Sequence, residues 1–192
     1  MEGYYDHHAT LQLNRPLAVA GMIGSPYRHT AYHVSSRTGL PFTDLDRKIE
    51  HEAGQSLWDL VTLRGEPALR ELERKVLLQT LRARPAGIIA LGDGTLLDAD
   101  NKRAVLESTT LVHLEMDLAA NYWHIRRHEE EHGRFWNPFL PSPITRIEEL
   151  RPVFQQLEPS LRDAHWVLPA AGRHSSQLAL EIIGRLQEVK AG

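Results

Sequence analysis

Charged side chains whose types suit acid-base chemistry gather at three places in the sequence. Asp44 and Asp46 are two residues apart, Arg70 lies three residues before Glu73, and Asp93 stands between two glycines. Neighbouring carboxylates can act as general acids or bases or bind a hydroxyl group, and an arginine offers paired donors that suit a carboxylate. The same residue types also fit a surface ion pair and ordinary helix caps, so the elements that position them decide between a site and a plain surface.

Four apolar runs predict buried strands, and segments with helical periodicity lie between them. Two of these strands end in glycine-rich turns, at 21–24 and 92–94. Strands separated by helices favour a parallel sheet covered on both faces, with its ligand site beyond the carboxyl ends of the strands. The strands are expected at 17–20, 87–91, 111–115 and 165–168, and the longer helices at 26–38, 66–81, 118–132, 147–157 and 175–189. Two shorter helices are expected in succession after Thr43.

The composition is that of an ordinary globular protein. The chain has 192 residues, 42% of them hydrophobic and 24% charged, with a formal net charge of -3 and no cysteine. This balance gives no reason to expect a nucleic acid or an anionic membrane as partner. No apolar run approaches the roughly 20 residues of a membrane helix, and the start lacks the features of a signal peptide. We expect a cytoplasmic protein with a polar extension at 1–14 and a single domain at 15–192, which carries a lid-like loop near 133–146.

The order and spacing of four segments resemble the shikimate kinase family, a group of small P-loop kinases. The resemblance runs from Leu17 to Val189, nearly the whole chain. It implies a three-layer α/β/α fold with a short parallel sheet in the topology of P-loop kinases. The four segments are Gly21-Met22-Ile23-Gly24, Pro41-Phe42-Thr43-Asp44-Leu45-Asp46 with Ile49-Glu50, Gly65-Glu66-Pro67-Ala68-Leu69-Arg70 with Glu73, and Gly92-Asp93-Gly94.

The resemblance also implies roles for the acidic and basic residues. By this resemblance, Asp46 would bind a ring hydroxyl of the substrate and help to deprotonate the hydroxyl that is phosphorylated. Asp44 would lie nearer a metal ion. Arg70 would bind the substrate carboxylate, with Glu73 on the same helical face to orient it. The turn Gly92-Asp93-Gly94 would lie against the substrate, which makes Asp46 and Asp93 the candidate catalytic residues.

The loop after the first strand departs from the family. A working P-loop combines free backbone N–H groups for phosphates, a lysine for the transferred phosphoryl group and a hydroxyl for magnesium. We interpret Ser25 as a helix N-cap followed by Pro26 at the first helical position, which satisfies donors that phosphate otherwise takes. We therefore expect no cofactor, and weak or absent binding of ATP and magnesium. The degenerate P-loop comprises Gly21, Gly24, Ser25, Pro26 in place of the second glycine, Tyr27 in place of the lysine and Arg28 in place of the hydroxyl residue.

Two further departures concern the substrate side. Asp93 replaces the middle glycine of the family's Gly-Gly-Gly turn, so either the ligand differs or the aspartate is a simple turn residue. Asn137 begins the Asn-Pro-Phe-Leu segment, where the family's lid carries an arginine. The arginine that completes the carboxylate clamp in the family has two candidates, Arg151 and Arg162, and the sequence leaves the choice open.

Three histidines are spaced by four residues in the predicted helix at 118–132. His124, His128 and His132 would lie near one face, where two of them could bind a metal ion. The flanking arginines and glutamates favour a solvated helical face instead. We therefore assign no metal site.

The missing kinase residues favour a protein that no longer transfers phosphate, because phosphoryl transfer depends on positioning and charge stabilisation. We expect a pseudokinase that binds or senses a small hydroxylated or aromatic carboxylic acid and signals through a protein partner or a homodimer. One alternative is an ATP-independent dehydratase, hydrolase or isomerase with Asp46 or Asp93 as general base. A second alternative is a divergent shikimate kinase.

Overall fold

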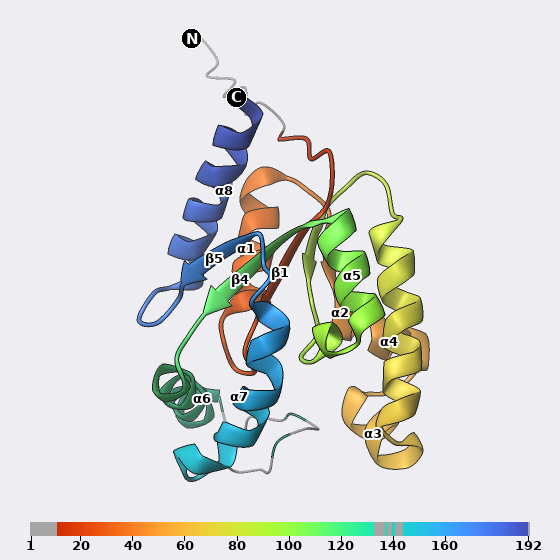
Figure 1. Ribbon diagram of the computed structural model, residues 1–192, viewed down its shortest axis with the longest axis vertical. Helices are drawn as coiled ribbons and strands as arrows, with labels where there is room; N and C mark the ends of the chain where they lie inside the picture. The colour runs from red at the N-terminus through yellow and green to blue at the C-terminus, as the bar shows by residue number, and fades with distance from the viewer. Residues whose placement is uncertain (1–10, 133–136, 138–139, 141–143, 192) are drawn as a thin grey trace, which may run out of the picture.

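The protein folds around one parallel β-sheet, which Figure 1 shows face-on. The computed structural model describes residues 11–132, 137, 140 and 144–191. Five strands run parallel in the order β2-β3-β1-β4-β5. The strands are β1 (Leu17–Gly21), β2 (Phe42–Asp44), β3 (Ile88–Ala90), β4 (Thr110–Glu115) and β5 (Trp166–Pro169). The helices are α1 (Tyr27–Thr38), α2 (Leu45–Ala53), α3 (Leu57–Arg64), α4 (Glu66–Leu81), the short 3₁₀ helix η1 (Thr95–Leu97), α5 (Ala99–Ser108), α6 (Leu118–His132), α7 (Ile147–Leu161) and α8 (Ser175–Ala191).

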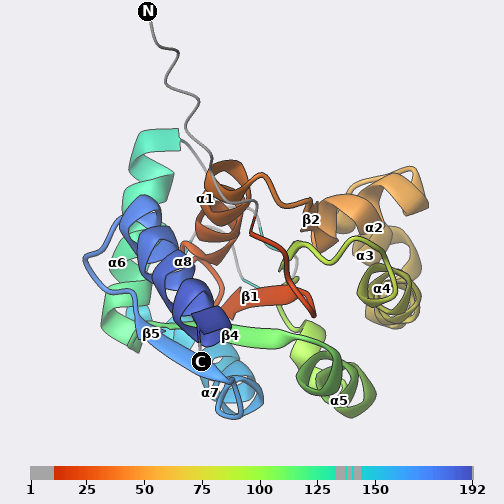
Figure 2. The same ribbon diagram turned by 90° about the horizontal axis from the view of Figure 1, so that it is seen from above.

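Helices cover both faces of the sheet (Figures 1 and 2). On one face, α1 and α8 pack on alternate residues of the central strand, Leu17 and Val19. On the other face, apolar residues of α4, α5 and α7 pack on Ala18 and Ala20. Residues 17–19 have no exposed surface, as expected for a parallel strand buried on both faces, where the sequence is apolar at successive positions. The predicted α/β/α fold with P-loop kinase topology is thus confirmed.

The sequence analysis missed β2, α5 and the short helix η1. Strand β2 has only three residues, all half-buried at the edge of the sheet, so it lacks the apolar run that marks a buried strand. Helix α5 buries only two of its residues, Asn101 and Val105, and therefore shows little apolar periodicity. Its start does carry a sequence signal, because the Asp98 side chain accepts hydrogen bonds from the N–H groups of Asp100 and Asn101.

The start of α1 differs from the predicted capped helix. Pro26, not Ser25, is the N-cap residue, and no side chain caps this end. The Oγ atom of Ser25 is buried without a hydrogen-bond partner among the described residues. A Cβ atom on Gly21 would clash with it, which explains the glycine. The first helical bond runs from the N–H of Thr30 to Pro26, so the preceding N–H groups of α1 have no partner within the helix.

The predicted domain boundaries stay predictions. Residues 1–10 of the extension and most of the lid-like loop at 133–146 lie outside the described residues. Leu11 and Leu13, at the end of the predicted extension, pack against the core between the sheet and helices α1 and α8. Within the described part of the chain, no helix is long and apolar enough to cross a membrane.

Candidate active site

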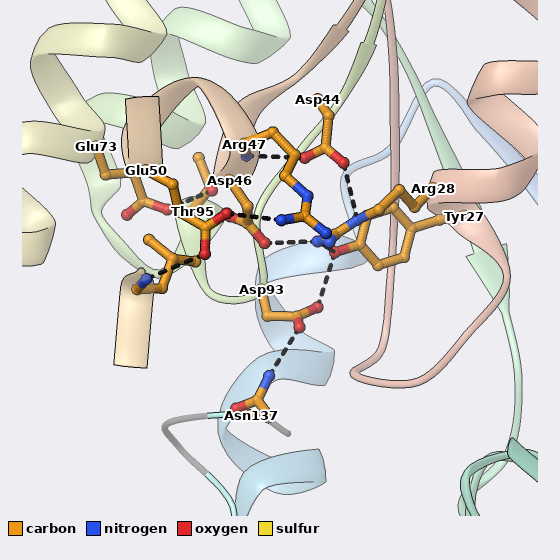
Figure 3. A network of polar contacts seen from close by, with 11 residues as sticks. Tyr27, Arg28, Asp44, Asp46, Arg47, Glu50, Glu73, Asp93, Thr95 and Asn137 are labelled. Atoms are coloured by element: carbon orange, nitrogen blue, oxygen red, sulfur yellow. Dashed lines mark hydrogen bonds and ion pairs between the residues drawn. The ribbon is translucent and has the colours of Figure 1, made fainter. Parts of the chain in front are cut away.

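The carboxyl ends of the strands carry a buried network of charged side chains (Figure 3). Arg28, in the first turn of α1, donates a hydrogen bond to the carboxylate of Asp46 and forms an ion pair with Asp44, 3.4 Å from Nε to Oδ2. Asp44 ends β2 and also caps α2 by accepting from the N–H of Arg47, whereas Asp46 lies in the first turn of α2. Burial and the neighbouring Asp44 raise the pKa of Asp46 against the opposing effect of Arg28.

Asp93 lies at the centre of this network. The Tyr27 hydroxyl donates to its Oδ1 at 3.0 Å, and the Asn137 amide donates to its Oδ2 at 2.9 Å. Arg28 in turn donates to the Tyr27 hydroxyl at 3.2 Å. Burial and the nearby Asp46 raise the pKa of Asp93 to about 7, although Arg28 opposes the shift. A carboxylate with this pKa can take up a proton near neutral pH, as a general base must.

Arg70 is held by two carboxylates of its own helix, α4. Its Nη2 lies 3.0 Å from Glu66 and its Nη1 lies 2.9 Å from Glu73. Glu73 is buried, with 2% of its surface exposed, and it also accepts a hydrogen bond from the Thr95 hydroxyl. Burial raises the pKa of Glu73, and Arg70 opposes this effect. The guanidinium group of Arg70 is thus fixed in orientation at the carboxyl edge of the sheet.

The glycines of the 92–94 turn let the backbone approach these side chains closely. A Cβ atom on Gly92 would clash with the carboxylate of Asp46. A Cβ atom on Gly94, which has φ +88°, would lie 2.7 Å from Nη2 of Arg70. The structure therefore brings together all the residues of the predicted site: Asp44, Asp46, Arg70, Glu73, Gly92, Asp93 and Gly94.

Two cavities meet at Asp93, which lines both. The larger, of about 520 Å³, lies in front of α1 and is bounded by residues 24–29 of the loop and helix start, by α2 and α3, and by α6. The smaller, of about 230 Å³, is lined by Glu66, Arg70 and Gly94 and by one face of α7. A site with two adjoining compartments has room for two ligands.

The choice between Arg151 and Arg162 as the second carboxylate-binding arginine stays open. Arg151 and Arg162 do not line the smaller cavity, and Arg162 instead lies 3.5 Å from Glu158 on the surface. The α7 side chains that face the cavity are Val153, Gln156 and Leu157. These residues are three and four positions apart and therefore lie on one face of the helix. A search restricted to arginine residues does not find this face.

Two histidines of α6 line the larger cavity. His124 and His128 are half-buried there, and the expected solvated helical face stays a prediction. The side chain of His132 lies outside the described residues. No group of three histidine or carboxylate side chains in the described part of the chain is arranged to hold a metal ion. The Tyr27 and Asn137 contacts to Asp93 were also missed, since no spacing in the sequence relates these three residues.

Comparison with known proteins decides the family. The family model for shikimate kinase matches residues 28–187. The chain belongs to the shikimate kinase family. A shikimate kinase from Paracidovorax citrulli is 31% identical over 172 residues, which cover 87% of this chain and 89% of that protein. A shikimate kinase from Cereibacter sphaeroides is 27% identical over 89% of this chain and 82% of its own length.

Solved structures support the fold of a shikimate kinase. The shikimate kinase from Acinetobacter baumannii in complex with shikimate superimposes with a TM-score of 0.82 at 20% identity, covering 96% of this chain and 98% of that one. The enzyme from Bacteroides thetaiotaomicron gives a TM-score of 0.76 at 21% identity, covering 93% and 99%.

These comparisons overturn two expectations. The relatives that span most of the chain are named shikimate kinases, so the expected pseudokinase was wrong and the alternative of a divergent shikimate kinase is the better supported one. The expectation of no cofactor is wrong for the same reason, since a P-loop kinase uses ATP with magnesium. The physical error lies at the start of α1, where Ser25 does not cap the helix. The helix start whose N–H groups the cap was expected to satisfy borders the larger cavity.

Proposed function

We propose that the protein is an ATP-dependent kinase that phosphorylates a hydroxyl group of shikimate. The observation that carries the proposal is the pair of cavities that meet at Asp93. The larger cavity lies at a helix N-terminus, which attracts phosphate groups. The smaller contains the fixed guanidinium of Arg70, which suits a carboxylate. A phosphoryl donor and an acceptor acid would thus lie on either side of one carboxylate.

The residues around the larger cavity fit a nucleotide with magnesium. The uncapped N–H groups at the start of α1 would donate hydrogen bonds to phosphate oxygens, and the buried Oγ of Ser25 is a donor without a described partner. Arg28 and Arg47 add positive charge. Asp44 offers the carboxylate oxygens that magnesium prefers. Bound ATP would supply the phosphoryl group, and magnesium would neutralise part of its charge.

The residues around the smaller cavity fit the acid. Arg70 lines this cavity with a guanidinium group, which suits a ligand carboxylate, and Gln156 of α7 lines the same cavity. We assign to Asp46 the orientation of the acceptor hydroxyl, since Arg28 holds its carboxylate in place. We assign to Asp93 the removal of the hydroxyl proton, since its pKa of about 7 suits a base at neutral pH.

The test is the formation of ADP by the purified protein with Mg-ATP, with and without shikimate. We expect ADP formation that depends on shikimate and shikimate that carries phosphate at the end of the reaction. A folded protein that hydrolyses no ATP and phosphorylates no shikimate would contradict the proposal. Quinate, which is also a hydroxylated cyclic acid, serves as a second acceptor to probe selectivity.

A further inference from the structure

Three imidazole groups converge on the larger cavity from two helices. His29 belongs to the first turn of α1, and His124 and His128 lie one turn apart on α6. The α6 helix packs directly against the loop before α1, since a Cβ atom on Gly24 would clash with Ile125. The cluster therefore lies next to the uncapped start of α1, where the proposed function puts the phosphates.

The other charged side chains of the cavity leave a deficit of positive charge. Among the described lining residues, the guanidinium groups of Arg28 and Arg47 face the carboxylates of Asp46, Glu50 and Asp93. Arg28 is already paired with Asp44 at the end of β2 and with Asp46 of α2, and Arg47 lies 3.1 Å from Glu50. A polyphosphate with one magnesium ion still carries negative charge. It meets enough positive charge only if the imidazoles take up protons.

We infer that a nucleotide polyphosphate binds in this cavity beside His29, His124 and His128, and that binding is coupled to proton uptake by the imidazole cluster around His124. The inference rests on the proposed nucleotide site and adds to it the side chains that supply charge where Tyr27 stands in place of a P-loop lysine. Nucleotide affinity is then set by pH as well as by concentration.

The direction of the pH effect follows from the groups that face His124. Burial holds the pKa of His124 below its usual value, and Arg127, His128 and His29 act in the same direction, whereas the Gly24 backbone opposes them. Phosphate oxygens beside the ring raise that pKa in the complex. The imidazole therefore takes up a proton on binding, and the affinity increases as the pH falls between the two pKa values. The acidic groups that face the cavity from the other elements are Asp46 and Glu50 of α2 and Asp93 of the 92–94 turn.

The test is calorimetric titration with the magnesium complex of the β,γ-imido analogue of ATP between pH 8 and pH 6. We expect binding about tenfold tighter at pH 6 and a net uptake of protons, measured in two buffers with different heats of ionisation. Inorganic tripolyphosphate should show the same trend, because the charge of the phosphates causes it. AMP, with one phosphate, should show a smaller one.

Variants assign the effect to the imidazoles. His124→Gln and His128→Gln should each weaken binding at pH 6 to about the wild-type value at pH 8. His124→Lys carries a fixed charge and should bind tightly at both pH values. His174→Gln, which alters an exposed histidine away from the cavity, is the matched control and should behave as wild type. Far-ultraviolet circular dichroism checks the fold of each variant.

Asp93 titrates in the same pH range and needs its own control. Asp93→Asn should keep the pH dependence, and its loss in this variant would assign the effect to Asp93 and overturn the inference. A pH-independent affinity in the wild-type protein, or an unchanged pH dependence in both glutamine variants, would overturn it too. If affinity is independent of pH while shikimate is phosphorylated, the proposed function stands and only the inference fails. If no nucleotide binds at any pH and no turnover occurs, both fail.

Discussion

The two sides of the candidate active site are built in different ways. On the acid side, which is the smaller cavity proposed for the substrate acid, Arg70 is fixed by two glutamates of its own helix. Glu66 lies four residues before it and Glu73 three residues after it. On the nucleotide side, which is the larger cavity proposed for ATP, the walls are the loop before α1, helices α2 and α3, and helix α6. These segments are separated by up to about a hundred positions in the chain. Side chains joined by helical spacing can be inferred from sequence. Side chains joined only by packing cannot, and there the sequence analysis failed.

Asp93 belongs to both sides, so its replacement should have the largest effect. We expect Asp93→Asn to lower kcat on the order of a thousandfold, because the amide cannot take up the hydroxyl proton, with little change in KM for shikimate. Steady-state kinetics with Mg-ATP and shikimate measures both constants. Asp163→Asn is the matched control, since Asp163 pairs with Lys102 outside both cavities. An unchanged kcat would remove Asp93 from the reaction.

Arg70 belongs to the acid side alone. We expect Arg70→Ala to raise KM for shikimate about 100-fold, since hydrogen bonds between charged groups are worth about 1.5–3 kcal/mol each, while KM for ATP stays within about twofold. Arg74→Ala removes an arginine of the same helix that pairs with Asp100 on the surface and should change neither constant. Equal changes in both KM values would show that the two sides are not independent.

The pH dependence of turnover distinguishes the two sides by its sign. A general base with a pKa of about 7 must be deprotonated, so kcat at saturating ligands should rise about tenfold from pH 6 to pH 8 and level off above pH 8. Nucleotide affinity, by the argument from the imidazoles, should change in the opposite direction. A flat kcat profile in this range, measured with both ligands saturating, would contradict the assignment of Asp93 as the base.

Gly94 gives the smallest expected effect. Gly94→Ala places a Cβ atom at positive φ and against Arg70, whereas Gly172→Ala meets the same φ penalty, at +69°, with no atom within 4 Å. We expect both to lower the free energy of unfolding by about 1 kcal/mol, and Gly94→Ala to cost about 1 kcal/mol more and to raise KM for shikimate. Urea denaturation of the two variants measures the difference. Equal losses would show that Arg70 moves aside without cost.

The fold was predictable where the sequence is apolar and periodic. The four expected strands were found within two residues. β1, β3 and β4 consist mainly of buried residues, whereas β5 buries only Leu168. β2 escaped notice because an edge strand of three half-buried residues carries no run of buried residues. At the start of α1, Ser25 is of a residue type that often caps helices, but its hydroxyl is buried beside Gly21. The tertiary packing of the loop, which composition does not report, overrides the local preference.

The pairing of Arg28 with Asp44 and Asp46 has a mechanical consequence. One side chain ties the first turn of α1 to the end of β2 and the start of α2, and α2 continues through α3 to α4 with its packed contacts. A movement of α2 toward or away from the acid would therefore be transmitted to α1. We expect the distance between the transferred phosphate and the acceptor hydroxyl to depend on this contact. Loss of the Arg28 side chain should therefore make the whole cleft more flexible.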